Sequence, residues 1–343
     1  MGDKTGISWT DATWSPTRGC RRISAGCENC YAERQAMRMS GTGGAYEGLV
    51  KLTSGGPRWT GDGRLVPSML DQPLRWTKPR RIFVDSMSDL FYEAFSFEDI
   101  AAVFGVMAAC PQHVFQVLTK RPERARAWFE WVATQRTGGG YEMDPVDLCG
   151  DESAGRGAFR KCSDGHADLT QKWPLPNVWL GCSVENQRAA DDRILELLRC
   201  PAALHWVSVE PQLEPVDLRA YLPNTALGGI AVGLPYALGW VVQGGESGPK
   251  ARPFDPTWAD DMREQCANAG VPYFMKQMGA VVIAHQETFG PGEAAERTWP
   301  NGTVFRNRTG DAKWNGRQVL LKSRAGADPA EWPDRYRVQE WPR

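Results

Sequence analysis

Three cysteines near the N-terminus have the types and spacing needed to bind a metal centre. Cys20, Cys27 and Cys30 lie in the stretch Gly-Cys-Arg-Arg-Ile-Ser-Ala-Gly-Cys-Glu-Asn-Cys-Tyr-Ala-Glu, residues 19–33. Three thiolates this close can hold three irons of a [4Fe-4S] cluster and leave the fourth iron open for a substrate or cofactor. A glycine precedes both Cys20 and Cys27, so the backbone can fold tightly around an inorganic core. The pattern indicates an iron–sulfur site on a loop that leads into a helix.

Zinc, disulfides and unrelated thiols are the alternatives to an iron–sulfur cluster at the cysteine motif. A structural zinc site normally has four ligands, and no fourth cysteine or histidine follows nearby, since the first histidine is His113. Disulfides suit the motif poorly, because three is an odd number and we find no signal peptide before it. Unrelated free thiols are the remaining alternative.

The composition is typical of a globular protein of the reducing cytoplasm. The chain of 343 residues is 42% hydrophobic and 24% charged, and we find no apolar run long enough to cross a bilayer. A net charge of -1 gives no global attraction to nucleic acid, although a local basic patch remains possible. The cysteines outside the motif are scattered, as expected of reduced thiols: Cys110, Cys149, Cys162, Cys182, Cys200 and Cys266.

The elements that would position the motif follow an α/β pattern. Short apolar or β-branched runs alternate with amphipathic segments, which favours a parallel sheet with helical crossovers. The chain is long enough for one large α/β barrel or for two ordinary domains. The predicted strands are residues 13–15, 81–85, 113–118, 177–182, 204–209, 239–243 and 271–275, and the predicted helices include residues 97–109, 188–198 and 256–269.

Polar residues follow the predicted strands at their carboxyl ends. Ligand sites in parallel α/β folds are built at these ends, so the polar residues are site candidates, although each alone could be a helix cap or a solvated turn. We find no GxxxxGK[ST] or GxGxxG loop, which disfavours nucleotide hydrolysis and dinucleotide binding. The candidates are Ser86, Ser88, Asp89, Lys120, Arg121, Ser183, Glu185, Asn186, Glu210, Gln243, Gly244, Gly245 and Glu246.

Three segments interrupt the alternation. Residues 40–71 and 137–171 are interpreted as loop insertions, because they lack apolar periodicity. Residues 280–343 are interpreted as a small β-rich appendage on a barrel of residues 1–279, with β-like pieces at 303–306 and 318–322. Within the second insertion, Cys149, Cys162 and His166 are candidates for a second metal, but they lack paired ligand spacing.

Given this motif at the start of a parallel barrel, the chain resembles the radical S-adenosylmethionine enzymes. In particular it resembles an uncharacterised phage and bacterial family marked by Gly-Cys…Ser-x-Gly-Cys-x-x-Cys-Tyr-Ala-Glu, and within the superfamily it is most similar to the branch with spore photoproduct lyase, which works on DNA. The chain departs from the common C-x3-C-x2-C spacing with C-x6-C-x2-C, and Asn29 stands where an aromatic residue is usual. The family-like blocks are residues 19–33, 84–91, 118–122, 180–186, 208–211 and 244–248.

The resemblance implies a fold, a cofactor pair and roles for the strand ends. The fold would be a partial or near-complete TIM-type barrel, and Cys20, Cys27 and Cys30 would ligate a [4Fe-4S] cluster that cleaves S-adenosylmethionine to a 5′-deoxyadenosyl radical. A flavodoxin or ferredoxin in a bacterial or phage-infected cell would donate the electron. For S-adenosylmethionine the expected contacts are Ser86, Ser88 and Asp89 to the amine, Ser183, Glu185 and Asn186 to the ribose, and Glu210 and Gln243 deeper. Lys120 or Arg121 would contact the carboxylate of the cofactor or a substrate phosphate.

The substrate implied by the resemblance is a nucleic-acid base or nucleotide, as in phage DNA hypermodification. The basic cluster at residues 120–126 would place Lys120, Arg121 and Arg124 near phosphates of a flipped or single-stranded base. Further substrate-binding candidates are Gly244, Gly245 and Glu246. Two alternatives remain: a non-catalytic zinc- or cluster-binding module, and a nuclease or glycosylase on a similar barrel.

Overall fold

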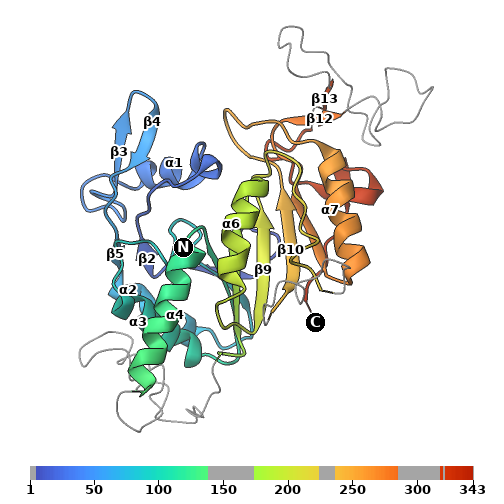
Figure 1. Ribbon diagram of the computed structural model, residues 1–343. Helices are drawn as coiled ribbons and strands as arrows, with labels where there is room; N and C mark the ends of the chain where they lie inside the picture. The colour runs from blue at the N-terminus through green and yellow to red at the C-terminus, as the bar shows by residue number, and fades with distance from the viewer. Residues whose placement is uncertain (1–4, 138–173, 224–235, 285–316, 320, 343) are drawn as a thin grey trace, which may run out of the picture. The chain divides into compact units, whose positions relative to one another are not determined.

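A parallel sheet of seven strands is the central feature of the computed structural model, which describes residues 5–137, 174–223, 236–284, 317–319 and 321–342 (Figure 1). The strand order is β1-β6-β7-β8-β9-β10-β11, so each strand pairs with the next sheet strand along the chain. This sequential order is that of a partial (β/α) barrel, and it confirms the predicted α/β fold. The strands are β1 (Ala12–Trp14), β6 (Arg81–Val84), β7 (Val114–Thr119), β8 (Val178–Ser183), β9 (Leu204–Val209), β10 (Leu238–Gly244) and β11 (Tyr273–Gln277).

Four helices connect successive strands of this sheet. They are α3 (Phe97–Ala108), α4 (Pro122–Thr137), α6 (Gln187–Leu197) and α7 (Pro256–Ala269), and the predicted helices match three of them within one residue. Local chemistry sets their ends: Ser96 and Asp99 form a capping box on α3, and Gly270 ends α7 at a φ of 68°. In the described part of the chain, no helix has both the length and the apolar character needed to cross a membrane.

The chain forms two compact units, each described separately below. Unit 1 comprises Met1–Ile23, Ala32–Cys182 and Arg193–His205. Unit 2 comprises Ser24–Tyr31, Ser183–Asp192 and Trp206–Arg343. The described residues after 279 therefore share a unit with β10 and β11, and the predicted boundary at 279–280 is not a boundary between these units.

Aromatic side chains fill the core of unit 1. Trp128 lies 4.3 Å from Phe104 between ring centroids, and its indole N–H donates to the carbonyl of Phe97 at 3.0 Å. The Trp14 indole donates to the carbonyl of Met69 at 2.7 Å. These indoles are buried with their polar atom satisfied, so their role is packing rather than stacking on a ligand.

A second aromatic core lies in unit 2, beside the last two strands. Trp206 and Trp240 are fully buried with ring centroids 5.3 Å apart. The C-terminal segment completes this core, because the Trp240 indole donates to the carbonyl of Glu340 at 2.9 Å and Trp341 packs against Phe274. In this unit α7 packs against β11, the strand that follows it in the chain.

Short elements occupy the stretches predicted as loops. Residues 40–71 include a hairpin of β3 (Val50–Thr53) and β4 (Gly56–Trp59), which the loop prediction missed. Near the C-terminus β12 (Val282–Ala284) pairs with β13 (Arg317–Val319), which overlaps the predicted strand at 318–322. Residues 303–306, 138–171 and the candidates Cys149, Cys162 and His166 lie outside the described residues. The other short elements are β2 (Thr17–Arg18), β5 (Arg64–Leu65), α1 (Tyr31–Arg38) and α2 (Pro67–Leu70).

Candidate functional site

The first motif cysteine, Cys20, belongs to unit 1, where the residue before it is tightly confined. Gly19 has a φ of 97°, and a Cβ at this position would lie 2.2 Å from the carbonyl oxygen of Asp62. The Ser88 hydroxyl donates to the Gly19 carbonyl at 2.6 Å. Glycine is therefore required at position 19. Ser88, which was predicted to contact a cofactor, anchors the cysteine segment through this hydrogen bond.

Arg121 makes the other main contacts to this segment. Its Nη2 donates to the carbonyl of Arg21 at 2.9 Å, and its Nη1 lies 3.9 Å from the Cys20 sulfur. Asp89 and Glu93 receive the remaining hydrogen bonds of the guanidinium, and the side chain is only 5% exposed. These hydrogen bonds hold the guanidinium among residues of unit 1. The sequence analysis had expected it to contact a phosphate.

The other two motif cysteines belong to unit 2. Cys27 ends a short 3₁₀ turn, and Cys30 directly precedes α1. The carbonyl of Ala25 accepts a hydrogen bond from Arg252 at 2.9 Å, and the Asn29 amide donates to Glu246 at 3.0 Å. Asn29, which departs from the aromatic residue usual at this place, thus ties the cysteine segment to the loop after β10.

Glu246 is the centre of this second anchor. Arg252 donates to both of its carboxylate oxygens, from Nε at 2.9 Å and from Nη2 at 2.6 Å. Burial alone would raise the pKa of Glu246, but the hydrogen bonds from Arg252 and Asn29 lower it below its ordinary value. The ionised carboxylate is therefore a fixed structural group, although the sequence suggested it as a substrate contact.

Gly26 and Glu185 meet closely within unit 2. A Cβ on Gly26 would lie 3.0 Å from the Glu185 carboxylate oxygen and 3.1 Å from its carboxyl carbon. Glu185 is itself buried, so it has little room to move. A side chain at the position before Cys27 would thus crowd a buried strand-end carboxylate, which adds to the sequence argument for a tight turn.

The motif thiols differ from the other described cysteines in their exposure. Cys20, Cys27 and Cys30 are reduced and partly exposed. Cys110, Cys182, Cys200 and Cys266 are reduced and buried, and burial raises the pKa of Cys200 to about 12. Among the described residues, no group of three or more Cys, His, Asp or Glu side chains is gathered as a ready-made metal site. The donor set suits a thiolate-bound cluster in its chemistry, while no assembled coordination geometry is present among them.

Asp85 is a buried acid that the sequence analysis treated only as the end of a strand. Its φ is 57°, and its carboxylate accepts hydrogen bonds from the Thr17 backbone at 3.1 Å and the Thr17 hydroxyl at 2.8 Å. Burial raises its pKa to about 8, against the lowering effect of the Thr17 hydrogen bonds. An aspartate directly after a buried strand and before Ser86 is the sequence signal that could have drawn attention to it.

Asp89 is fully engaged inside unit 1. It accepts hydrogen bonds from the Thr119 hydroxyl at 2.7 Å, from the Lys120 backbone at 3.0 Å and from Arg121 at 3.0 Å. The carboxylate therefore fixes the turn that follows β7. The Lys120 side chain, by contrast, makes no ion pair with any described residue.

Arg124 also points inward. Its Nη2 donates to the Phe95 carbonyl at 2.6 Å, and its guanidinium lies 4.9 Å from the centre of the Phe97 ring. Within the predicted basic cluster, Arg121, Arg124 and Arg126 thus have partners among the described residues, whereas Lys120 has no ion pair with them.

The remaining strand-end candidates have different roles. Ser86 belongs to unit 1, and the others belong to unit 2. Asn186 caps α6, since its side-chain oxygen accepts from the Ala189 backbone at 2.9 Å. Gln243 is fully buried and bonded to Gln212 and Tyr273. Ser183 and Glu185 are buried at the end of β8, and Ser86 is half-buried after β6.

The sequence analysis identified only one member of an ion pair at the ends of β9 and β11. Glu210 was predicted, but its partner Lys276 was not; the Lys276 amine lies 2.7 and 2.9 Å from the two carboxylate oxygens. A Cβ on Gly244 would lie 3.4 Å from the Glu210 carboxyl carbon, and one on Gly245 would lie 2.3 Å from the Met278 carbonyl. Close packing therefore requires glycine at position 245, whereas a Cβ at position 244 would meet its nearest atom, Cγ of Gln277, at 3.2 Å.

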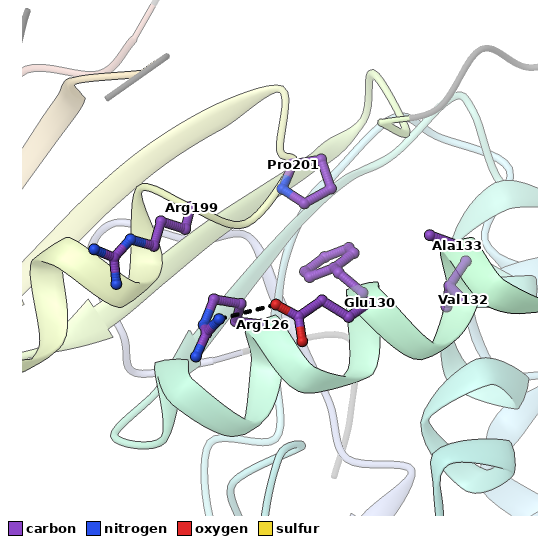
Figure 2. Close-up of a pocket in the computed structure, with 7 residues that line it drawn as sticks. Arg126, Glu130, Val132, Ala133, Arg199 and Pro201 are labelled. Atoms are coloured by element: carbon purple, nitrogen blue, oxygen red, sulfur yellow. Dashed lines mark hydrogen bonds and ion pairs between the residues drawn. The ribbon is translucent and has the colours of Figure 1, made fainter. Parts of the chain in front are cut away.

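The pocket drawn in Figure 2 lies elsewhere in unit 1 and has a volume of about 390 Å³. Arg126 pairs with Glu130 at 2.9 Å and with Glu196 at 2.5 Å, so its charge is already compensated. Pro201 precedes β9, at the amino end of that strand, whereas ligand sites of parallel sheets lie at the carboxyl ends. The pocket is therefore separate from the cysteine motif; its lining residues are Arg126, Phe129, Glu130, Val132, Ala133, Arg199 and Pro201.

Comparison with known proteins identifies the family. A family model described as "Protein of unknown function (DUF5131)" matches residues 4–319, which include the cysteine motif and all the strand-end candidates. The chain belongs to the DUF5131 family. No curated protein matches it. A solved structure, a cysteine-to-serine mutant of spore photoproduct lyase, matches over 94% of this chain and 72% of that chain, with 10% sequence identity and a TM-score of 0.35. A similarity this low says nothing about what this DUF5131 chain does.

Replacing Gly26 tests the contact with Glu185. In this DUF5131 chain, Gly26→Ala forces a Cβ against a buried carboxylate, so we expect less iron bound after anaerobic reconstitution and a melting temperature lower by a few degrees. Gly41→Ala is the matched control, because a Cβ at Gly41 has nothing within 4 Å. Equal iron content and melting temperature in the two variants would show that the contact is unimportant.

Asp85 predicts a pH dependence of stability. Its ordinary pKa is 3.8 and burial raises it to about 8, so between these values the folded chain binds more protons than the unfolded chain. The stability that this group contributes is fully present below the ordinary pKa and is lost as the pH rises through about 8. We expect the melting temperature to fall more steeply over this range in the parent than in Asp85→Asn; identical pH profiles would contradict the assignment.

Proposed function

We propose that this chain is a radical S-adenosylmethionine enzyme in which Cys20, Cys27 and Cys30 hold a [4Fe-4S] cluster. The observation that carries the proposal is the contrast among the described cysteines, since the three closely spaced thiols are partly exposed and the scattered ones are buried. Such a cluster, with S-adenosylmethionine bound, supplies a 5′-deoxyadenosyl radical that abstracts hydrogen from an unactivated carbon. The parallel sheet supports the proposal, because it orders the strand ends on which a ligand site can be built.

The chain's own contribution in this proposal is to hold the ligand loop. Arg121 and Ser88 fix the segment around Cys20, and Arg252 with Asn29 fixes the segment around Cys27. Rigid support of ligands is what a metal site needs, because loosely held ligands lose affinity and geometry.

Contacts to S-adenosylmethionine are proposed at two strand ends. Glu185 suits a ribose hydroxyl, since its carboxylate lies against the backbone of the cysteine segment at Gly26. Lys120 suits either the carboxylate of the cofactor or a substrate phosphate, because it makes no ion pair with a described residue. A flavodoxin or ferredoxin is the proposed electron donor.

Cluster formation and cofactor cleavage test the proposal together. Anaerobically reconstituted parent should contain iron and sulfide, absorb visible light, and after dithionite reduction convert S-adenosylmethionine to 5′-deoxyadenosine, which chromatography detects. Each of Cys20→Ala, Cys27→Ala and Cys30→Ala should lose the chromophore and the product, whereas Cys110→Ala, a change at a buried thiol outside the motif, should keep both.

Three outcomes would point to the alternative functions. Zinc in place of iron would indicate a structural metal module. An intact cluster without cofactor cleavage would indicate a structural cluster. Nucleic-acid cleavage that survives Cys27→Ala and needs no reductant would indicate a nuclease or glycosylase.

The proposed substrate is a nucleotide within a polymer, such as a modified base of phage DNA. Lys120 follows β7 at its carboxyl end and carries a charge that no described residue pairs. Because the net charge of the chain is -1, binding should be modest and directed to a flipped or single-stranded base.

Oligonucleotide titrations at several salt concentrations test this substrate class. Losing one phosphate contact reduces the slope of log K against log salt by about one, so we expect this change in Lys120→Ala. Lys51→Ala is the matched control, since Lys51 is an exposed lysine on β3. If neither DNA nor RNA binds at low salt, or if both variants match the parent, a small-molecule or peptide substrate replaces nucleic acid.

A further inference from the structure

The hydrogen bonds of Arg121 are divided between a carboxylate pair and the Cys20 segment. Its Nε donates to Glu93 at 3.0 Å, and its Nη2 donates to the Arg21 carbonyl at 2.9 Å. Its Nη1 has two hydrogens and two acceptors, namely the Asp89 carboxylate at 3.0 Å and the Cys20 sulfur at 3.9 Å. The guanidinium is therefore a directed donor to a thiol that the motif assigns to metal binding.

The guanidinium is held rigidly in this position. Its side chain is 5% exposed, and the Tyr92 ring lies 4.9 Å from its central carbon. Asp89 cannot turn away, because it also accepts from the Thr119 hydroxyl and the Lys120 backbone. The guanidinium already has a fixed orientation, so its contact with a metal-binding thiol costs little side-chain entropy. The contact with the Cys20 sulfur can therefore persist with a metal bound.

A buried cation that donates to a cluster ligand has a known electrostatic consequence. Reducing an iron–sulfur cluster adds negative charge, and hydrogen bonds to its sulfurs together with nearby positive charge stabilise the reduced form. Because the donor is shielded from solvent, water screens this interaction less than it would at the surface. Glu93, which is 59% exposed, acts mainly through water and affects a cluster less.

We infer that Arg121 is a positioning residue that holds Cys20 in place and raises the reduction potential of the cluster by donating to the Cys20 sulfur. The inference rests on the proposed function, since it assumes that Cys20 ligates the cluster. It gives Arg121 a task different from the phosphate contact suggested by its place in the basic stretch.

A matched set of variants separates this role from a structural one. Arg121→Met combined with Asp89→Asn removes the donor without leaving a buried unpaired carboxylate, and it removes one positive and one negative charge, so the net charge stays the same. Arg121→Lys keeps the charge but loses the planar fork. Glu93→Gln removes the exposed partner and leaves the Cys20 contact in place.

The experiment is a redox titration of anaerobically reconstituted full-length protein, followed by electron paramagnetic resonance, with iron and sulfide content measured alongside. We expect the midpoint potential to shift to more negative values in the double variant, to shift the same way by less in Arg121→Lys, and to stay near the parent value in Glu93→Gln. If the double variant does not fold, Arg121→Lys carries the test.

Equal potentials in the parent, Arg121→Lys and any folded double variant, at equal cluster content, would overturn the inference while leaving the proposed function intact. Absence of iron and sulfide from the parent would instead overturn the proposed function itself. The two failures are therefore distinguishable in the same set of samples.

Discussion

Burying a charged side chain near a strand end raises the free energy of the folded state unless an opposite charge or a hydrogen-bond partner compensates it. This constraint organises both units. In unit 1, Asp89 is paired with Arg121. In unit 2, Glu246 is paired with Arg252. Each arginine then donates to a backbone carbonyl of the cysteine motif, at Arg21 or at Ala25. The arginines that neutralise the strand-end carboxylates are thus the same side chains that hydrogen-bond to the cysteine motif.

The same constraint divides the strand-end residues into two kinds. Asp89, Gln243 and Glu246 have their polar atoms engaged by neighbours and act as parts of the framework. Lys120, by contrast, makes no ion pair with a described residue. The role of a polar residue after a parallel strand therefore depends on the partners that other segments bring to it.

Much of the fold could be predicted from local pattern. The helix at Pro256–Ala269 and the strand at Leu204–Val209 have the predicted bounds, because periodicity, caps and turns are encoded in neighbouring residues. The hairpin at Val50–Trp59 was missed, since Gly55, Gly56 and Pro57 interrupt its strands and remove the alternating pattern. Lys276 could not be matched to Glu210 from local pattern, because the two residues are far apart in the chain.

By itself, the sequence determined the cysteine spacing, the α/β alternation and the polar strand ends, since each depends on residues close together in the chain. Only the tertiary structure decided that Arg121 and Arg124 point inward, that Gly26 is limited by Glu185, and that Asp85 is buried enough for a pKa of about 8. Burial and hydrogen-bond partners are supplied by segments distant in sequence. A basic or acidic side chain therefore looks the same in the sequence whether it faces a ligand or a buried counter-charge.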